Sequence, residues 1–238
     1  LPGVKFIEFN NSNQLDAITE ATAAVIIETI QGDAGVRIPD RDFMKALRQR
    51  CDETGTMLIL DEIQCGMGRC GSLFAFDQFG IVPDILTLGK ALGGGMPIGA
   101  FIANKKHMSQ LTHDPMLGHI TTFGGHPVIA AAANACVEVL KEENWIKTAE
   151  EKGKILEDML SNHPDIKEIR RRGLMFAIDM ESDERVAQVV EKCLKKGLIS
   201  FWFLSHPHSF RLSPPLSISK EEIKQAGEII LDAIEETA

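Results

Sequence analysis

The sequence predicts an α/β fold, with a mostly parallel sheet in a large domain and a small α+β domain after it. In the first part of the chain, short runs of branched apolar residues alternate with helical patterns, which is typical of βαβ units. After about Lys141, charged amphipathic helices and paired strands replace that pattern. We therefore expect one domain over residues 1–140 and a second over residues 141–238. A chain of 238 residues, 44% of them hydrophobic, can bury a sizeable core.

The first βαβ unit is predicted at residues 23–60. Residues 23–28 form a short apolar run, which predicts a buried parallel strand. A helical pattern follows Pro39, with one face formed by Phe43, Ala46, Leu47 and Cys51. Gly55 ends this helix, and residues 57–60 read as the next strand. A strand–helix–strand of this length predicts a right-handed crossover between parallel strands.

The next segments predict two more strands and a helix. Residues 84–88 and 98–103 are short and apolar, and the glycines at 93–95 keep the connection between them short. Residues 113–127 are rich in Gly, His and Thr and are expected to be irregular. Residues 128–140 are almost wholly apolar and rich in alanine, which predicts a buried helix.

The last hundred residues predict a separate set of elements. A charged amphipathic helix is expected at 146–160, and two strands split by Gly173 at 166–180. Residues 184–196 read as a helix that ends at Gly197 in a left-handed cap. Strands are expected at 198–204 and 210–212. Ser219 begins the final helix, with Glu222 in the capping-box position.

Composition excludes several classes of function. The formal net charge is −9, and the only basic tract is residues 170–172, so we expect no nucleic-acid partner and read these arginines as a solvated turn or strand edge. Five cysteines at irregular spacing, without a C-x-x-C pair, indicate reduced thiols in a cytoplasmic protein and no metal site. Since no apolar run reaches membrane-spanning length, no membrane partner is expected.

Two strand ends carry the chemistry. Residues 58–64, Leu-Ile-Leu-Asp-Glu-Ile-Gln, read as a buried strand that ends at Asp61, and residues 87–95 as a strand that ends at Lys90 before a glycine run. In an α/β sheet both ends open into one crevice. A carboxylate keeps a pyridine nitrogen protonated, an unprotonated lysine reacts with an aldehyde, and glycines can cradle a phosphate. The pair therefore suits pyridoxal phosphate.

Other interpretations of these residues stay open at this point. Lys90 by itself is better explained as a surface lysine after a strand. A strand that ends in Asp-Glu is also typical of magnesium-binding strands in P-loop NTPases, but the required G-x-x-x-x-G-K-[ST] is missing, since Ala91 follows Gly89-Lys90. Cys65 and Cys70 lie among glycines and read as small fillers of a turn.

Five segments in order resemble the class III pyridoxal phosphate-dependent aminotransferases, the family of ornithine, acetylornithine and 4-aminobutyrate aminotransferases. The matching segments are residues 28–35, 61–71, 83–90, 121–127 and 210–216. The resemblance implies a fold type I transferase and transamination from an ω-amino acid or an ornithine- or acetylornithine-like donor to 2-oxoglutarate. It also implies a homodimer at least, with active sites shared between subunits.

The resemblance implies a role for each matched residue of the cofactor site. Lys90 would be the Schiff-base lysine that also moves protons, and Asp61 would pair with the pyridinium nitrogen. Ile63 would pack on one face of the ring, and Gln64 would hydrogen-bond the phenolic oxygen. Thr122 would reach the cofactor phosphate of the neighbouring subunit.

Two further positions match substrate-binding residues of the family. Arg211 would hold the substrate carboxylate, a task that suits its planar fork of donors. Glu28 matches the glutamate that in some members pairs with this arginine and releases it between half-reactions.

The sequence also departs from the family, because members are considerably longer at the N-terminus. The loop that grips the cofactor phosphate and the aromatic residue that stacks on its ring are not found, and the chain has no tyrosine. We expect the full-length protein to be an aminotransferase and these 238 residues by themselves to be inactive or nearly so. The alternatives are a related aminomutase, racemase or decarboxylase, or an inactive truncated fragment that packs against a partner subunit.

Overall fold

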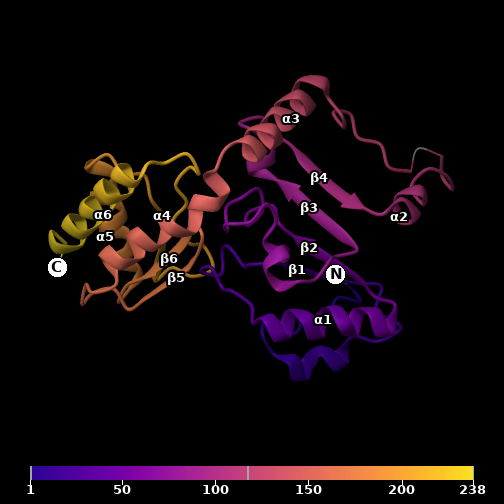
Figure 1. The fold of residues 1–238 in the computed structure, drawn as a ribbon. Helices are drawn as coiled ribbons and strands as arrows, with labels where there is room; N and C mark the ends of the chain where they lie inside the picture. The colour runs from indigo at the N-terminus through magenta and orange to yellow at the C-terminus, as the bar shows by residue number, and fades with distance from the viewer. Residues whose placement is uncertain (1, 117, 238) are drawn as a thin grey trace. The chain divides into compact units, whose positions relative to one another are not determined.

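Two four-stranded sheets organise the chain (Figure 1). The structure, a computed structural model, describes residues 2–116 and 118–237. These residues form two units. Unit 1 contains residues 2–29, 39–64 and 76–141, and unit 2 contains residues 30–38, 65–75 and 142–237. Two short segments from the first part of the chain therefore fold with the later unit.

The sheet of unit 1 is mostly parallel, as predicted. Strands β1 (Ala24–Glu28), β2 (Met57–Asp61) and β3 (Ile85–Gly89) are parallel neighbours in that order, and β4 (Gly99–Ala103) pairs antiparallel with β3. Helix α1 (Arg41–Thr54) connects β1 and β2, which confirms the βαβ unit. A parallel neighbour needs a crossover of about a dozen residues or more. Only the short helix η3 (Lys90–Gly93) and a turn join β3 to β4, so β4 runs back.

Helix α1 follows the pattern in its sequence. Its buried residues are Phe43, Met44, Leu47 and Cys51, at the helical spacing that forms one apolar face. Burial raises the pKa of the Cys51 thiol to about 11, so this thiol is protonated and inert at neutral pH. Gly55 ends the helix in the left-handed conformation, with φ of 67°.

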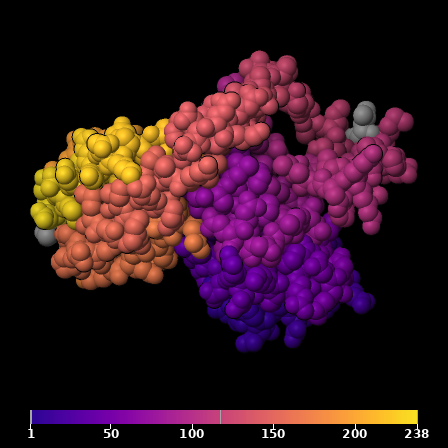
Figure 2. Space-filling view, viewed as in Figure 1, coloured from indigo at the N-terminus to yellow at the C-terminus, as the bar shows by residue number. Residues whose placement is uncertain are grey.

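Helix α3 (Pro127–Glu142) lies at the predicted place but is not buried. Leu140 is its one buried residue, whereas Val128 is 58% and Val139 39% exposed. Figure 2 shows the helix, in pink, on the surface. An apolar composition gives burial only where another element covers the helix. Within the described part of unit 1, no element contributes enough side chains to do so, and the prediction of a buried helix is wrong.

The remaining elements of this region are short. They are η1 (Ser12–Ala17), η2 (Ala75–Phe79) and α2 (Lys105–Ser109). The segment expected to be irregular, residues 113–127, carries no helix or strand among its described residues before α3 begins at Pro127. One of its members, Leu117, lies outside the described residues.

Unit 2 is an α+β arrangement. Its sheet is antiparallel in the order β5-β6-β8-β7, formed by β5 (Glu168–Arg172), β6 (Met175–Asp179), β8 (Ser209–Leu212) and β7 (Phe201–Trp202). Helices α4 (Trp145–Leu160), α5 (Asp183–Lys195) and α6 (Lys220–Glu235) pack with it in one core. The capping box of Ser219 and Glu222 is present, and Gly197 has φ of 89°, as predicted.

Strand β6 is buried on both faces. Phe176 and Ile178 belong to the core shared with the helices. Met175 and Ala177, which alternate with them, pack with a second cluster that includes Cys65 and other residues of segments 30–38 and 65–75. The cysteines of the glycine-rich turn are thus core fillers. Among the described residues, no group of three or more His, Cys, Asp or Glu is placed to hold a metal ion.

Strand β7 is much shorter than the predicted 198–204. The N–H groups of Leu204 and Ser205 donate to the carboxylate of Asp33, each at 3.1 Å, in place of a neighbouring strand. These bonds to Asp33 end the pairing of β7 with its neighbouring strand. Because Asp33 is distant in sequence, no local pattern predicts this end of the strand.

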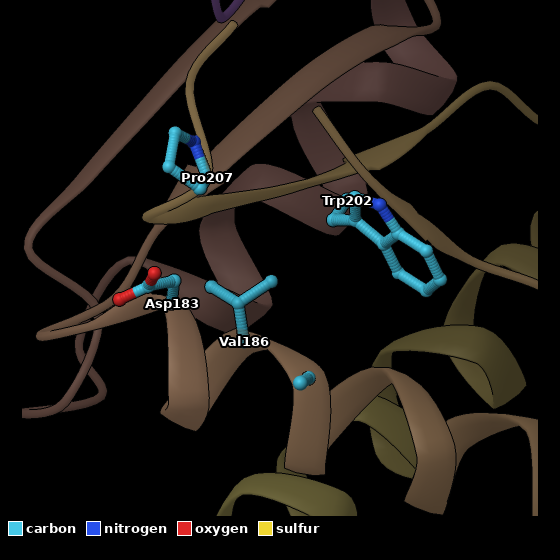
Figure 3. Close-up of a pocket in the computed structure, with 5 residues that line it drawn as sticks. Asp183, Val186, Trp202 and Pro207 are labelled. Carbon is cyan, nitrogen blue, oxygen red and sulfur yellow. The ribbon is translucent and has the colours of Figure 1, made fainter. Parts of the chain in front are cut away.

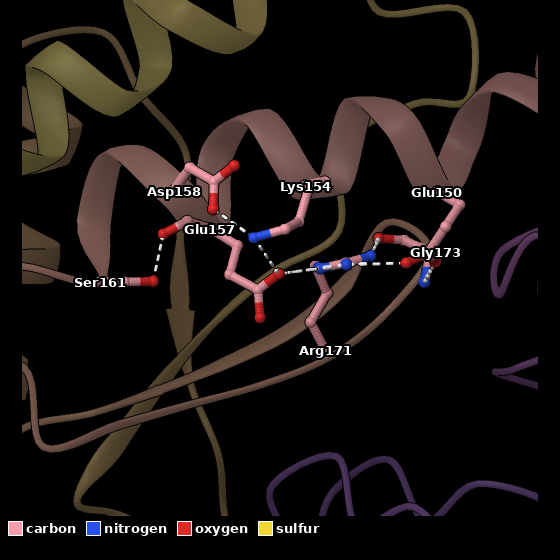
Figure 4. Close-up of polar contacts among 7 residues, drawn as sticks. All are labelled: Glu150, Lys154, Glu157, Asp158, Ser161, Arg171 and Gly173. Atoms are coloured by element: carbon pink, nitrogen blue, oxygen red, sulfur yellow. Dashed lines mark hydrogen bonds and ion pairs between the residues drawn. The ribbon is translucent and has the colours of Figure 1, made fainter.

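The three arginines of β5 lie on an edge strand, and two of them are held by acidic side chains. The Arg171 side chain is 7% exposed and pairs with Glu150 at 2.7 Å and Glu157 at 3.2 Å, both on α4 (Figure 4). Arg170 is similarly engaged by Asp179 at 2.6 Å. The prediction of a strand edge is confirmed, but the prediction that the arginines are solvated is wrong for Arg170 and Arg171, because acidic residues on other elements cover their side chains.

No helix in the described part of the chain combines the length and the apolar character needed to cross a membrane.

Candidate active site

A row of polar side chains lies near the carboxyl ends of the parallel strands in unit 1. Glu28 on β1 is the register partner of Asp61 on β2, and Asp61 is the partner of Thr87 on β3. Register partners on neighbouring strands project from the same face of a sheet. Two carboxylates and a hydroxyl therefore share one face where these strands end.

The Asp-Glu pair at the end of β2 divides into two roles. The Asp61 carboxylate accepts a hydrogen bond from the N–H of Ile63 at 2.9 Å, which fixes the turn after the strand. Glu62 is 1% exposed and accepts from the Thr29 hydroxyl at 2.9 Å and from the Phe76 N–H at 2.7 Å. Glu62 is thus a buried structural carboxylate. The alternation of side chains along a strand predicts that Glu62 faces away from Asp61. Its hydrogen-bond partners could not be predicted, because they are distant in sequence.

Lys90 follows β3 directly and has an unusual backbone. It is exposed, and its φ is 44°, in the left-handed region that residues other than glycine rarely adopt. Strained backbone conformations of this kind cluster at functional sites. The residue before it, Gly89, has extended backbone, so steric space, not φ, explains the glycine. A Cβ there would lie 3.3 Å from both the Ile63 side chain and the Ile98 carbonyl oxygen.

This close approach brings two predicted site residues together. Ile63 packs against Gly89, and Gly89 is bonded to Lys90. Thr87 lies three residues before Lys90, roughly 10 Å along an extended strand. Asp61, Ile63 and Lys90 are therefore neighbours at one end of the sheet.

The Thr87 hydroxyl was not identified from the sequence. Its oxygen is buried and has no hydrogen-bond partner among the described residues. An unsatisfied buried hydroxyl typically costs about 1–3 kcal/mol, so an oxygen of this kind needs an explanation. Its position in the row with Asp61 makes a bound group the simplest one.

The glycine run after Lys90 forms a tight turn that contacts α3. Gly94 has φ of 56°, and a Cβ there would lie 3.2 Å from the Ala132 carbonyl oxygen. The Cys136 thiol donates to the Ala91 carbonyl at 3.2 Å. Close packing on a helix therefore explains Gly94 without a phosphate.

Gln64 and Thr122 are less engaged. Gln64 is half-buried and Thr122 is exposed, and neither side chain hydrogen-bonds another residue in the described ranges 2–116 and 118–237. The structure thus brings neither side chain into a polar contact with Asp61 or Lys90.

Arg211 belongs to unit 2, on β8, and is half-buried. Its guanidinium carbon lies 5.7 Å from the centroid of the Phe201 ring on β7. Unit 2 also contains a pocket of about 230 Å³ between α5 and β7, lined by Asp183, Val186, Ala187, Trp202 and Pro207 (Figure 3). None of the predicted site residues lines this pocket.

Known proteins resemble the chain over nearly its whole length. The model of the family "Aminotransferase class-III" matches residues 6–234. The chain is 42% identical, over 99% of its length, to acetylornithine aminotransferase of Methanocaldococcus jannaschii, and 44% identical, over 94%, to ornithine aminotransferase 1 of Staphylococcus aureus strain MRSA252. It covers 58% and 56% of these two proteins.

Solved structures agree with the sequence relatives. The ornithine aminotransferase of Toxoplasma gondii, whose structure has partial occupancy of pyridoxal phosphate at the active site, matches with a TM-score of 0.91 and 34% identity over 100% of this chain and 57% of that one. The fold is thus that of the pyridoxal phosphate-dependent aminotransferases, as predicted. The chain spans a little more than half the length of these relatives. From the extent of the family match and these identities, the chain belongs to the class III aminotransferases.

Proposed function

We propose that the protein containing this chain transfers an amino group from an ornithine- or acetylornithine-like donor, or another ω-amino acid, to 2-oxoglutarate. The row of Glu28, Asp61 and Thr87 beside Lys90 is the observation that carries this proposal. The relatives named acetylornithine and ornithine aminotransferase support the class of donor.

Pyridoxal phosphate is the cofactor that membership of this family implies, and the residues present fit it. Asp61 offers a carboxylate at the end of the sheet, Ile63 an apolar surface, and Lys90 an exposed amine. The buried, unpartnered oxygen of Thr87 on the same face leaves one polar group available to a bound molecule. The cofactor supplies an aldehyde that accepts amino groups and a ring that withdraws electrons from the substrate carbon.

The residues of the chain would perform the remaining tasks. Asp61 would hold a proton on the ring nitrogen, and its bond from Ile63 N–H keeps the carboxylate oriented. Lys90 Nζ would take the proton from the substrate carbon and return it on the other side of the transfer. Ile63 would cover one face of the ring and exclude water, and Gln64 would donate to the phenolic oxygen.

Two charged residues would bind the substrates. Arg211 would hold a carboxylate of the donor or acceptor through paired N–H donors. Glu28 would neutralise this arginine when the substrate in the site lacks the second carboxylate, which would let one site serve two substrates of different charge.

The assembly and the domains are also proposals. We propose a cytoplasmic homodimer or larger oligomer in which Thr122 reaches the cofactor phosphate of the neighbouring subunit. Residues 1–140 would belong to the cofactor-binding domain and residues 141–238 to the small domain. An exposed Thr122 is compatible with a role toward a second subunit.

A product assay tests the reaction. The full-length protein, loaded with pyridoxal phosphate, is incubated with ornithine or N-acetylornithine carrying ¹⁵N in the ω-amino group, and with 2-oxoglutarate. Appearance of ¹⁵N-glutamate supports transamination. Release of carbon dioxide, inversion at the α-carbon, or an amino group moved within one molecule would instead identify a decarboxylase, racemase or aminomutase and overturn the proposal.

A further inference from the structure

The guanidinium of Arg211 lies over an aromatic ring. Arg211 and Phe201 are register partners on the antiparallel strands β8 and β7, so their side chains share one face of the sheet. The guanidinium carbon lies 5.7 Å from the ring centroid, which is within the range of a cation–π interaction. Phe201 is 49% exposed, so the hydrophobic core does not account for this aromatic residue.

Among the residues that the structure describes in unit 2, no carboxylate forms an ion pair with this guanidinium. Among the described residues of unit 2, the Phe201 ring is the group that contacts this guanidinium, and no ion pair or hydrogen bond joins it to another side chain. Asp33 is the charged group that Arg211 influences electrostatically, but its carboxylate already accepts from the Leu204 and Ser205 N–H groups and from the Ser205 hydroxyl at 2.6 Å. The Ser205 hydroxyl, with smaller contributions from these N–H groups and Arg211, outweighs burial and lowers the pKa of Asp33.

A guanidinium can contact a ring and a carboxylate at the same time. Its positive charge can stack on a ring through the flat face, whereas its five N–H donors lie in the plane and point to the edges. A side chain held by its face therefore keeps its donors available for an incoming carboxylate.

We propose that Phe201 is a positioning residue for Arg211, which holds the guanidinium by its face so that its edge can bind the substrate carboxylate. This proposal rests on the proposed role of Arg211. Phe201 itself touches no substrate. Loss of the ring lets the long arginine side chain sample other rotamers, and carboxylate affinity falls while proton transfer at Lys90 is unaffected.

The test measures carboxylate binding apart from turnover. Glutarate is a dicarboxylate without an amino or oxo group, so it binds without reacting. Its dissociation constant is measured by calorimetry on the full-length, cofactor-loaded protein, with thermal unfolding of each variant recorded in parallel. Phe201→Leu removes the ring, and Phe201→Tyr keeps it. Leu204→Ala is the matched control, because that side chain is an 83% exposed apolar group of the same segment without a ring over Arg211.

Phe201→Leu is expected to weaken glutarate binding about three- to tenfold, which is the range of a partly exposed cation–π contact. Phe201→Tyr and Leu204→Ala should stay within about twofold of the wild type, and Arg211→Ala should lose more than Phe201→Leu. The Michaelis constant for the oxo acid should rise with the same pattern, with kcat nearly constant. If Phe201→Leu does not fold, Phe201→Met is measured in its place.

Three outcomes would overturn the inference: no glutarate binding by the wild type, unchanged affinity in Phe201→Leu, or an equal loss in Leu204→Ala. Failure of the proposed function gives a different result. Glutarate binding that depends on Phe201 and Arg211, in a protein that forms no ¹⁵N-glutamate, would sustain the inference and refute the transamination.

Discussion

Helix α4 contains a glycine whose replacement should be costly although it lies in a helix. Alanine normally stabilises a helix interior by about 1 kcal/mol relative to glycine. At Gly153, however, a Cβ would lie 2.1 Å from the carbonyl oxygen of Gly173 and 2.7 Å from Nη1 of Arg171. A backbone carbonyl cannot rotate away as a side chain can, so the helix would have to move.

The distances at Gly153 set the size of that movement. Ordinary contact at this type of atom pair begins near 3.4 Å, so Gly153→Ala would displace α4 by roughly 1 Å from the β5–β6 turn. Glu150 on α4 accepts from the Gly173 N–H at 3.1 Å and pairs with Arg171 at 2.7 Å, and both contacts would be stretched or lost. Overpacking costs about 1–3 kcal/mol, and a hydrogen bond to a charged group about 1.5–3 kcal/mol. After the helical gain, we expect a net destabilisation of about 2–3 kcal/mol.

Gly227 provides the matched control. It is also a buried helical glycine, in α6, but a Cβ there would meet the far end of the Met159 side chain, at 2.6 Å from Cε. A methionine can change rotamer at small cost, so Gly227→Ala should be within about 1 kcal/mol of the wild type. Urea unfolding followed by circular dichroism measures both, and the Gly153→Ala midpoint should fall by about 1 M. Equal midpoints for the two variants, or a stabilised Gly153→Ala, would refute the reasoning.

Three further predictions concern unit 1. Replacing Lys90 by Ala should prevent borohydride from fixing the cofactor covalently to the protein. If mass spectrometry of the borohydride-treated wild type found the reduced cofactor attached to another lysine, Lys90 would not be the Schiff-base residue. Thr87→Val should leave stability unchanged or raise it by about 1 kcal/mol, since it removes an unpartnered buried hydroxyl, but should weaken cofactor retention during dialysis; equal retention would remove Thr87 from the site. Burial raises the pKa of Asp84, but hydrogen bonds from the Leu58 N–H and from Arg48, each at 2.8 Å, outweigh burial and lower this pKa. The stability that ionised Asp84 contributes is therefore complete above about pH 4 and is lost as the pH falls through the folded-state pKa. Asp84→Asn should flatten the acid side of a plot of urea midpoint against pH, and parallel plots for variant and wild type would contradict this.

Features with a local cause could be predicted from the sequence. The helix with Phe43, Leu47 and Cys51 on one face, the left-handed Gly55 and the Ser219 capping box each depend on residues within a few positions of one another. The parallel strands that end at Asp61 and before Lys90 follow from apolar runs of the right length. Once these strands pair in register, Glu28, Asp61 and Thr87 lie side by side.

Features with a distant cause could not be predicted. The burial of α3 depends on what covers it, and its own alanine-rich sequence does not specify a partner. Asp33 ends β7 by taking N–H groups more than 170 positions away in the sequence. Arg171 is buried by Glu150 and Glu157, which belong to another element. The unpartnered Thr87 oxygen is visible only after the strands are placed.

The division of the chain has a consequence for how its chemistry can vary. The residues proposed to hold the cofactor and move protons lie at the ends of two adjacent strands of unit 1. Asp61 holds the backbone of Ile63 through a hydrogen bond, and Ile63 packs against Gly89, the residue before Lys90. The residue proposed to bind the carboxylate, Arg211, is held in unit 2 by a cross-strand ring. Changes in the β7–β8 hairpin can therefore alter which acids bind without disturbing the groups that react. Substitutions at Gly89 should alter cofactor retention and turnover together. Ile63 packs into the space that a side chain at Gly89 would fill, and Lys90 is the next residue in the chain.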